Sequence, residues 1–162
     1  MARYAVAGCK ISIGGALADK SVDFVAADFT SQTWVEIGEW VTMGDLGDAA
    51  ATITSQIIGL GRDKNAKGTR QAPAYECVFN RDDLDAGQIA VRAAEKTNNN
   101  FAIKIEYNDK PAIGGAPKNS VEYFIALVSS ARGVGGGANT NRTLTVSLLP
   151  NSNIVLVAAS AT

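Results

Sequence analysis

Apolar and polar positions alternate along much of the chain and divide it into short strand-like runs. The clearest run covers residues 101–107, where Phe, Ile, Ile and Tyr alternate with Ala, Lys and Glu. Similar runs, separated by clusters of turn residues, cover residues 3–13, 33–41, 52–60, 74–79, 121–130, 144–148 and 154–159. This pattern predicts about seven or eight strands.

Two of these runs differ in how their faces are divided. In the run at 74–79 the two-residue period of a strand separates the apolar side chains from Glu76. The apolar set, which we expect in the core, is Tyr75, Cys77 and Phe79. The run at 33–41 carries large apolar side chains on both faces, so it predicts one strand that is covered on two sides.

One segment, residues 83–96, has helical rather than strand-like spacing. Asp82 and Asp83 lie where carboxylates can accept hydrogen bonds from the free N–H groups of a first turn. Asp85 lies three residues before Gln88, which is the spacing of a capping box. Helical periodicity assigns the core face to Ala86, Ile89, Ala90 and Ala93. These side chains are small, so we expect the helix to pack closely against a sheet.

Many strands and one helix predict a mainly β fold, a β-sandwich or partly closed barrel with one flanking α-helix. The length of 162 residues suits one domain, because single domains commonly run to about 100–200 residues. Apolar residues make up 46% of the chain, which is enough to offset the entropy of ordering it. We therefore expect residues 1–162 to form one domain without a linker.

Composition removes several classes of function. Histidine is absent, so the chain lacks the commonest general base and the commonest metal ligand. A formal net charge of −1 excludes strong capture of nucleic acid or of an acidic membrane by the molecule as a whole. Cys9 and Cys77 lie in separate runs, which favours two buried free thiols over a disulfide. We expect a protein made in a cytoplasm and not bound to a membrane, because no apolar stretch has the length of a signal peptide or a membrane span.

Two patterns that are typical of enzymes lack the context that their chemistry needs. Residues 133–138 fit a G-x-G-x-x-A dinucleotide fingerprint, but a strand-like run follows where a helix should bind the pyrophosphate. Glutamates on strands could supply an acid/base pair, yet nothing in the sequence brings two of them together. These glutamates are Glu36, Glu76, Glu106 and Glu122. We expect no catalytic residue, no cofactor and no metal site.

The most unusual stretch is the polar segment at residues 61–73, which has almost no apolar side chains. Its cations are Arg62, Lys64, Lys67 and Arg70. Asp63 is its single anion, so the segment carries a local charge of +3. The runs at 52–60 and 74–79 flank it, and we expect them to be the two sides of a long polar hairpin arm. A compact monomer has little reason to keep such an arm, although a solvated loop is the simpler interpretation.

The order of the elements is as informative as any one of them. The segment Trp34-Val-Glu-Ile-Gly-Glu-Trp40 precedes a Gly-Asp-Leu-Gly turn, and the polar arm, the acidic-capped helix and the strand at 101–107 follow. The chain closes with residues 124–130, a loop and residues 142–148. In this order the chain resembles, over residues 33–159, the major tail tube proteins of long-tailed, siphovirus-like bacteriophages. That family is related in fold to type VI secretion tube proteins.

The resemblance implies hexameric rings that stack into a hollow tube, with sheets from the six subunits joined into a barrel around the lumen. Such a subunit is a structural virion protein of the phage tail, assembled in the cytoplasm of the host. The tube conducts double-stranded DNA during ejection without binding it specifically. Its expected partners are further copies of itself and the tape-measure, tail-terminator and baseplate or tip proteins.

The resemblance also implies roles for charged residues. The arm would reach the neighbouring ring and order against an acidic patch on the next subunit. The candidate residues of that patch are Asp45, Asp48, Asp82, Asp83 and Asp85. A DNA conduit should have an acidic lumen, with a lysine as a local exception. The candidate lining residues are Glu76, Lys104, Glu106 and Glu122.

Other interpretations remain open at this point. A type VI secretion-type tube subunit would share the fold and would form rings that carry effectors. A carbohydrate-binding β-sandwich module would display a planar aromatic platform, for which Trp34 and Trp40 are the candidates. An enzyme is the weakest interpretation, because no acid, base, nucleophile or metal set is assembled by the sequence.

Overall fold

The computed structural model describes residues 3–162, so residues 1 and 2 of the N-terminal segment lie outside the described part. Within that part, eight strands form one antiparallel sheet in the order β2-β1-β7-β8-β9-β6-β3, with β10 paired to β8. The strands are β1 (Lys10–Ala16), β2 (Val35–Glu36), β3 (Trp40–Thr42), β6 (Tyr75–Asn80), β7 (Phe101–Glu106), β8 (Val121–Val134), β9 (Thr143–Pro150) and β10 (Val155–Val157). Two further strands, β4 (Ala49–Ser55) and β5 (Lys64–Gln71), pair only with each other.

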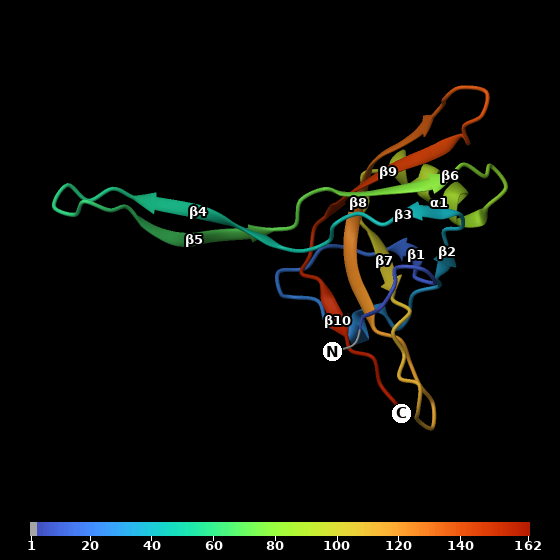
Figure 1. Ribbon diagram of the computed structural model, residues 1–162, viewed down its shortest axis with the longest axis horizontal. Coiled ribbons are helices and arrows are strands. Elements are labelled where there is room, and N and C mark those ends of the chain that lie inside the picture. Colours follow the sequence, from blue (N-terminus) through green and yellow to red (C-terminus); the bar gives the residue numbers. More distant parts are fainter. Residues whose placement is uncertain (1–2) are drawn as a thin grey trace.

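Figure 1 shows the large sheet curled around α1 (Ala86–Glu95), with the β4–β5 hairpin projecting far to one side. This mainly β architecture, with its curled half-barrel sheet, one α-helix in the described residues and a hairpin arm, is the fold that the sequence predicts.

One face of the sheet, here called the core face, carries the main hydrophobic core. β6 turns Tyr75, Cys77 and Phe79 into it with no exposed surface and leaves Glu76 exposed, which confirms the predicted alternation. α1 packs across this face against β8, β2 and β1. Each fully buried large apolar side chain contributes about 1.5–3 kcal/mol, so the two-residue alternation of β6, β7, β8 and β9 supplies most of the driving force.

The opposite face of the sheet, here called the outer face, is covered in part by a second cluster. The short 3-10 helix η1 (Ala26–Phe29) and the residues just before it place Phe24 and Phe29 against Ala102 and Ile125. Phe29 stacks on Tyr123 with 5.2 Å between the ring centroids. Side chains from both faces of β7 and β8 are therefore buried.

Two strand predictions near the N-terminus are wrong in their bounds. The run at 3–13 becomes a strand only at Lys10, because Gly8 turns the chain with a φ of 89°. The run at 33–41 is not one strand but β2 and β3, separated by Glu39 with a φ of 61°. The backbone of Glu39 accepts a hydrogen bond from the Asn80 N–H at 2.8 Å, which holds this interruption against β6.

The predicted hairpin exists, but its strand pairing is wrong. β4 pairs with β5, for example Ile53 with Ala66, whereas β6 pairs with β3 and β9 in the main sheet. The polar segment that was expected to connect two strands is itself the return strand. Its lack of apolar alternation hid it, because both faces of an isolated hairpin meet water.

The helix prediction is correct in position and wrong in its buried face. The buried residues are Gly87, Gln88, Val91 and Ala94, whereas Ile89 is half exposed. Gly87 is required there, because any side chain at this position would collide with the backbone of Glu36. The predicted face of Ala86, Ile89, Ala90 and Ala93 therefore turns largely to solvent.

Of the predicted N-terminal signals only the cap at Asp85 is confirmed: α1 begins at Ala86, and the Asp82 and Asp83 carboxylates bind Leu84 N–H and two arginines instead of the first helical turn. The reciprocal half of the capping box is absent. The Asp85 carboxylate accepts a hydrogen bond from the Gln88 N–H at 2.8 Å. The Gln88 side chain is fully buried and donates to the carbonyl oxygens of Asn80 and Gly38, at 2.8 and 3.3 Å, instead of reaching back to its own N-cap. The same amide also accepts from the Asp82 N–H at 3.0 Å, so Gln88 ties the helix to two neighbouring loops.

Replacing Glu39 by glycine should stabilise the protein. A left-handed φ costs an L-residue about 1–2 kcal/mol and costs glycine almost nothing, so we expect a net gain of about 0.5–1 kcal/mol. The midpoint of urea unfolding should rise with an unchanged slope. The matched control is Glu36→Gly on β2, which should lower the midpoint because glycine weakens a strand. An equal decrease of the urea midpoint in both variants would contradict the predicted gain from glycine at position 39.

Candidate functional site

The arm, defined here as residues 49–71, is a two-stranded hairpin that leaves the body of the protein (Figure 1). Six cross-strand pairs join β4 to β5, and one bulge between Ala50 and Thr52 shifts their register. Two-stranded hairpins are marginally stable in water, because they bury little apolar surface. The arm thus buries little apolar surface between its own two strands.

The two faces of the arm differ in chemistry. Register and alternation place Thr52, Thr54, Lys67 and Arg70 on one face, where the Thr54 hydroxyl donates to Asn65 Oδ1 at 2.8 Å. The other face carries the small apolar set of Ala51, Ile53 and Ala66, together with Lys64. Gly68 is compatible with this close packing, since a Cβ there would lie 3.3 Å from the Cβ of Ala51. The predicted cations of the arm therefore do not form one stripe.

The tip of the arm, residues 56–63, is apolar at its turn. The Leu60 N–H donates to the Ile57 carbonyl oxygen at 2.9 Å and closes the turn. The exposed fractions of Ile57, Ile58 and Leu60 are 46%, 107% and 48%, so none of these side chains is buried in a hydrophobic core. Arg62 and Lys64 follow directly and are also exposed.

The sequence pattern does not reveal this apolar tip, because it predicts that residues 52–60 are one strand of the hairpin throughout, whereas β4 ends at Ser55. Glycines on both sides of Leu60, at positions 59 and 61, are the signal that could have identified a turn. An apolar turn at the end of an otherwise polar hairpin is typical of a contact surface rather than of a solvated loop.

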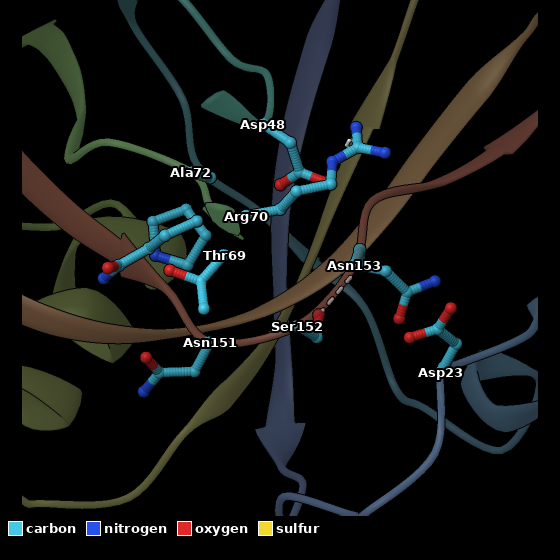
Figure 2. A pocket seen from close by; sticks show the side chains of 10 residues that line it. Asp23, Asp48, Thr69, Arg70, Ala72, Asn151, Ser152 and Asn153 are labelled. Carbon is cyan, nitrogen blue, oxygen red and sulfur yellow. Dashed lines mark hydrogen bonds and ion pairs between the residues drawn. The ribbon is translucent and has the colours of Figure 1, made fainter. Parts of the chain in front are cut away.

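A polar cleft of about 550 Å³ lies at the base of the arm. Figure 2 shows Asp48 and Arg70 at one end of this cleft and Asp23 with Asn153 at the other. Arg70 Nη2 lies 3.6 Å from Asp48 Oδ2, so these two predicted partners from different subunits already form an ion pair within one chain. This pair lies where the arm joins the body, and it orients the base of the arm.

The candidate acidic residues fall into two groups, which the structure keeps in separate elements. Asp45 and Asp48 lie in the connection between β3 and β4, and both are exposed. Asp82, Asp83 and Asp85 precede α1. Asp82 Oδ1 accepts from the Leu84 N–H at 2.9 Å, and Asp85 both caps α1 and accepts from the Gly38 N–H at 3.2 Å.

Asp83 has two cationic partners of its own. Arg81 Nε lies 3.0 Å and Arg92 Nη1 lies 2.6 Å from its Oδ1. The hydrogen bonds from Arg81 and then from Arg92 lower the pKa of Asp83 to about 2. Much of the charge of this carboxylate is therefore neutralised within the chain.

The candidate lumen residues do not share one face of the sheet. Glu76, Lys104 and Glu106 lie on the outer face, as their pairing with Ser147, Tyr123 and Val121 shows. Glu122 pairs with the buried Ile105 and lies on the core face, where its Oε2 accepts from the Tyr107 hydroxyl at 2.7 Å. Lys104 Nζ lies 5.4 Å from the centroid of the Trp34 ring, and Glu106 Oε1 accepts from Asn119 Nδ2 at 2.8 Å.

The two tryptophans do not form one platform. Trp34 belongs to the outer-face cluster beside Tyr123, whereas Trp40 packs into the main core and stacks on Phe79 at 6.4 Å. Both indoles are half buried and they lie on opposite sides of the sheet. The aromatic surface on which a carbohydrate-binding module depends is not assembled by this pair.

A second cleft, here called the N-terminal cleft, has a volume of about 290 Å³. Its lining includes Tyr4, Val6, Cys9, Met43, Tyr107 and Asp109. Cys9 is half buried and Cys77 is fully buried, and both are free thiols, as predicted for the pair.

Among residues 3–162, no helix combines the length and the apolar character needed to cross a membrane.

Comparison with known proteins gives a clear result for the fold. No protein-family model and no curated protein matches the chain. Solved structures do match: the SPP1 tail tube has a TM-score of 0.63 and 15% identity, over 93% of this chain and 76% of that one. A component of the anti-feeding prophage baseplate has a TM-score of 0.66 and 9% identity, over 98% of both chains. The sheath/tube terminator of the PVC extracellular contractile injection system reaches 0.66 with 13% identity, over 98% of this chain and 99% of that one.

An Hcp protein also matches, with a TM-score of 0.51 and 8% identity over 93% of this chain and 98% of its own. At these identities the likeness establishes the fold. The chain has the tail tube fold, which recurs in the SPP1 tail tube, in a component of the anti-feeding prophage and in a component of the PVC injection system.

The ion pairs of Asp83 predict a measurable titration. Its carboxyl carbon should titrate in an NMR experiment with a midpoint near 2. Because this pKa is lowered in the folded state, the stabilisation is present above the ordinary pKa of 3.8 and is lost as the pH falls through about 2. Arg81→Gln should move the midpoint upward, whereas Lys96→Gln should not. An unchanged midpoint in the Arg81 variant would reject the assignment.

The two thiols should differ in reactivity. Burial raises the pKa of the Cys77 thiol to about 12, so at pH 8 this group is almost wholly protonated. We expect a maleimide to label native Cys9 at least ~100-fold faster than Cys77, and both at similar rates in urea. Mass spectrometry of the labelled peptides measures this, and Cys9→Ser should remove the fast phase. Fast labelling of native Cys77 would contradict the described core.

Proposed function

We propose that this chain is a non-enzymatic, structural tail tube subunit of a siphovirus-like phage, which polymerises as stacked hexameric rings and conducts DNA during ejection. The observation that carries this proposal is an unpartnered hairpin arm on a tail tube fold. The arm has exposed apolar and cationic side chains and few contacts with its own body, so it needs a second surface. A neighbouring ring offers that surface.

In this proposal the cations of the arm reach an acidic patch on the next subunit. Lys64, Lys67 and Arg62 are exposed and have no ion-pair partner among residues 3–162, whereas Arg70 pairs with Asp48 at the base. Of the acidic candidates, Asp45 is exposed and is the one least committed within the chain, since Asp83 has two arginines and Asp85 caps α1. Charges of this kind guide association and set its dependence on salt more than they set affinity.

The outer face of the sheet is the proposed lining of the lumen. It carries Glu76 on β6 and Glu106 on β7, with Lys104 on β7, beside the Trp34 ring, as the cationic exception. Glu122 lies on the core face, and it would contribute to the lumen only at the edge of the subunit. An acidic lining suits a conduit for DNA, because like charges prevent the nucleic acid from adhering to the wall.

The proposed partners are further copies of the chain and the tape-measure, tail-terminator and baseplate or tip proteins, within a virion tail assembled in the cytoplasm of the host. A tube subunit of an injection or type VI secretion-type system is the second candidate. Its support is the same likeness in fold, which extends to components of the anti-feeding prophage and of the PVC extracellular contractile injection system. Particles isolated from the native source separate the two, since a contractile sheath around the tube would favour the second.

Negative-stain electron microscopy of concentrated protein tests the proposal directly. Rings or tubes with sixfold symmetry are the expected result. A protein that stays monomeric under all conditions of concentration and salt would reject a tube subunit of either kind.

Reversal of charge in the arm should block polymerisation without unfolding the body. The variant combines Arg62→Glu, Lys64→Glu and Lys67→Glu and keeps the Arg70–Asp48 pair at the base of the arm. It should leave the circular dichroism spectrum and the thermal midpoint nearly unchanged, because these residues contact no core. Tubes should be absent by electron microscopy and by sedimentation. The matched control replaces the exposed body residues Lys96, Lys110 and Lys118 by Glu, with the same change of net charge. Normal tubes from the arm variant, or equal losses in both, would contradict a specific role for the arm.

A further inference from the structure

The apolar tip of the arm is the least satisfied surface in the described chain. Ile58 is fully exposed, and Ile57 and Leu60 have about half of their surface in water. Figure 1 shows why the body cannot cover them, because the hairpin holds its turn far from every other element. Burial of such side chains is the main source of affinity at protein interfaces, where a few anchors dominate.

The N-terminal cleft has the complementary properties. Tyr4 and Val6 are each 62% exposed at its edge, and Met43 and Tyr107 form the rest of its apolar lining. Asp109 also lines it, and the carboxylate of this residue accepts hydrogen bonds from the Ser120 N–H at 2.7 Å and the Ser120 hydroxyl at 2.6 Å. Exposed Asp45 lies two residues after Met43 in the chain.

Charge complementarity indicates which exposed apolar group of the chain fits the N-terminal cleft. The tip is followed at once by Arg62 and Lys64, which would lie beside Asp109, the charged residue of the lining, when the isoleucines enter the cleft. Leu84 is also highly exposed, but it lies between Asp83 and Asp85, whose charge has the same sign as that of Asp109. Opposite charges favour the arm tip over Leu84 as the occupant.

The arm tip projects away from its own body (Figure 1), so it can enter the N-terminal cleft only of a second copy of the chain. A contact between two different surfaces of identical subunits is heterologous, and it propagates instead of closing a dimer. Propagation from one layer to the next is what a stacked tube requires.

We propose that residues Ile57, Ile58 and Leu60 at the tip of the arm anchor in the N-terminal cleft of a second copy, lined by Tyr4, Val6, Met43 and Tyr107. This inference rests on the proposed function and names its contact. The cations of the arm then guide the approach, and the apolar tip holds the subunits together.

The half-buried thiol of Cys9 in the cleft provides a direct test. In the Ile58→Cys variant, mild oxidation of assembled tubes should join position 58 of one copy to Cys9 of another. Non-reducing gels should show a ladder of multimers, and mass spectrometry should identify the peptide pair. The matched control, Ile58→Cys with Cys9→Ser, should assemble and lose the ladder, while the wild type should give none because its second thiol, Cys77, is buried.

A second variant measures how much the anchor matters. Ile58→Asp should raise the protein concentration at which tubes first form by about tenfold or more, which is typical of losing a central anchor. Ile113→Asp, at another highly exposed isoleucine on the body, is the control and should assemble as the wild type does. Both variants should retain the wild-type circular dichroism spectrum.

The outcomes separate the two proposals. Wild-type tubes together with a cross-link at any position other than Cys9, or with normal assembly of Ile58→Asp, would overturn the inference and leave the tube intact. If the wild type forms no tube, a concentration-dependent disulfide between positions 58 and 9 in soluble oligomers would support the contact and reject the tube. If neither the tubes nor this disulfide forms, the tube function and the proposed contact are both rejected.

Discussion

Burial of one face of a curled antiparallel sheet is the constraint on which the rest of the structure depends. β6, β7, β8 and β9 commit every second side chain to the core under α1, so their intervening residues must face outward. The outer face is then available for other surfaces, and only its β1–β7–β8 side is covered by the η1 segment. The position of every charged candidate on the sheet follows from this alternation, including the separation of Glu122 from Glu76 and Glu106.

The strands of the core could be predicted from the sequence because burial leaves a local signal. Tyr75, Cys77 and Phe79, and likewise Leu144, Val146 and Leu148, alternate as a half-buried strand requires. The mainly β class follows from this signal, whereas the helix follows from its helical spacing and the arm from its polar, cationic composition. Strand β5 leaves no such signal, because neither of its faces is buried, and the pairing of the arm was therefore assigned to the wrong partner.

The features that the sequence did not predict depend on tertiary contacts. The buried face of α1 contains Gly87 and Gln88, a residue without a side chain and a polar amide, which hydrophobic periodicity cannot select. Their reasons lie in other elements: the backbone of Glu36 leaves no space at Gly87, and two distant carbonyl groups satisfy Gln88. Among the candidate site residues, the cations of the arm could be located from composition. The apolar tip was harder to locate, since Ile57 and Ile58 have the same local pattern as a core strand and only the glycines at positions 59 and 61 indicate a turn.

The attachment of the arm has a mechanical consequence. Its two strands join the body through β3 and β6, which are hydrogen-bonded neighbours, and β6 is paired with β9 along its whole length. In Figure 1 the arm and β6 run in nearly the same direction. A pull on the arm therefore acts along β6 and loads its hydrogen bonds to β9 together, rather than opening them one after another from an end. The hairpin is attached in the geometry by which a sheet best resists tension.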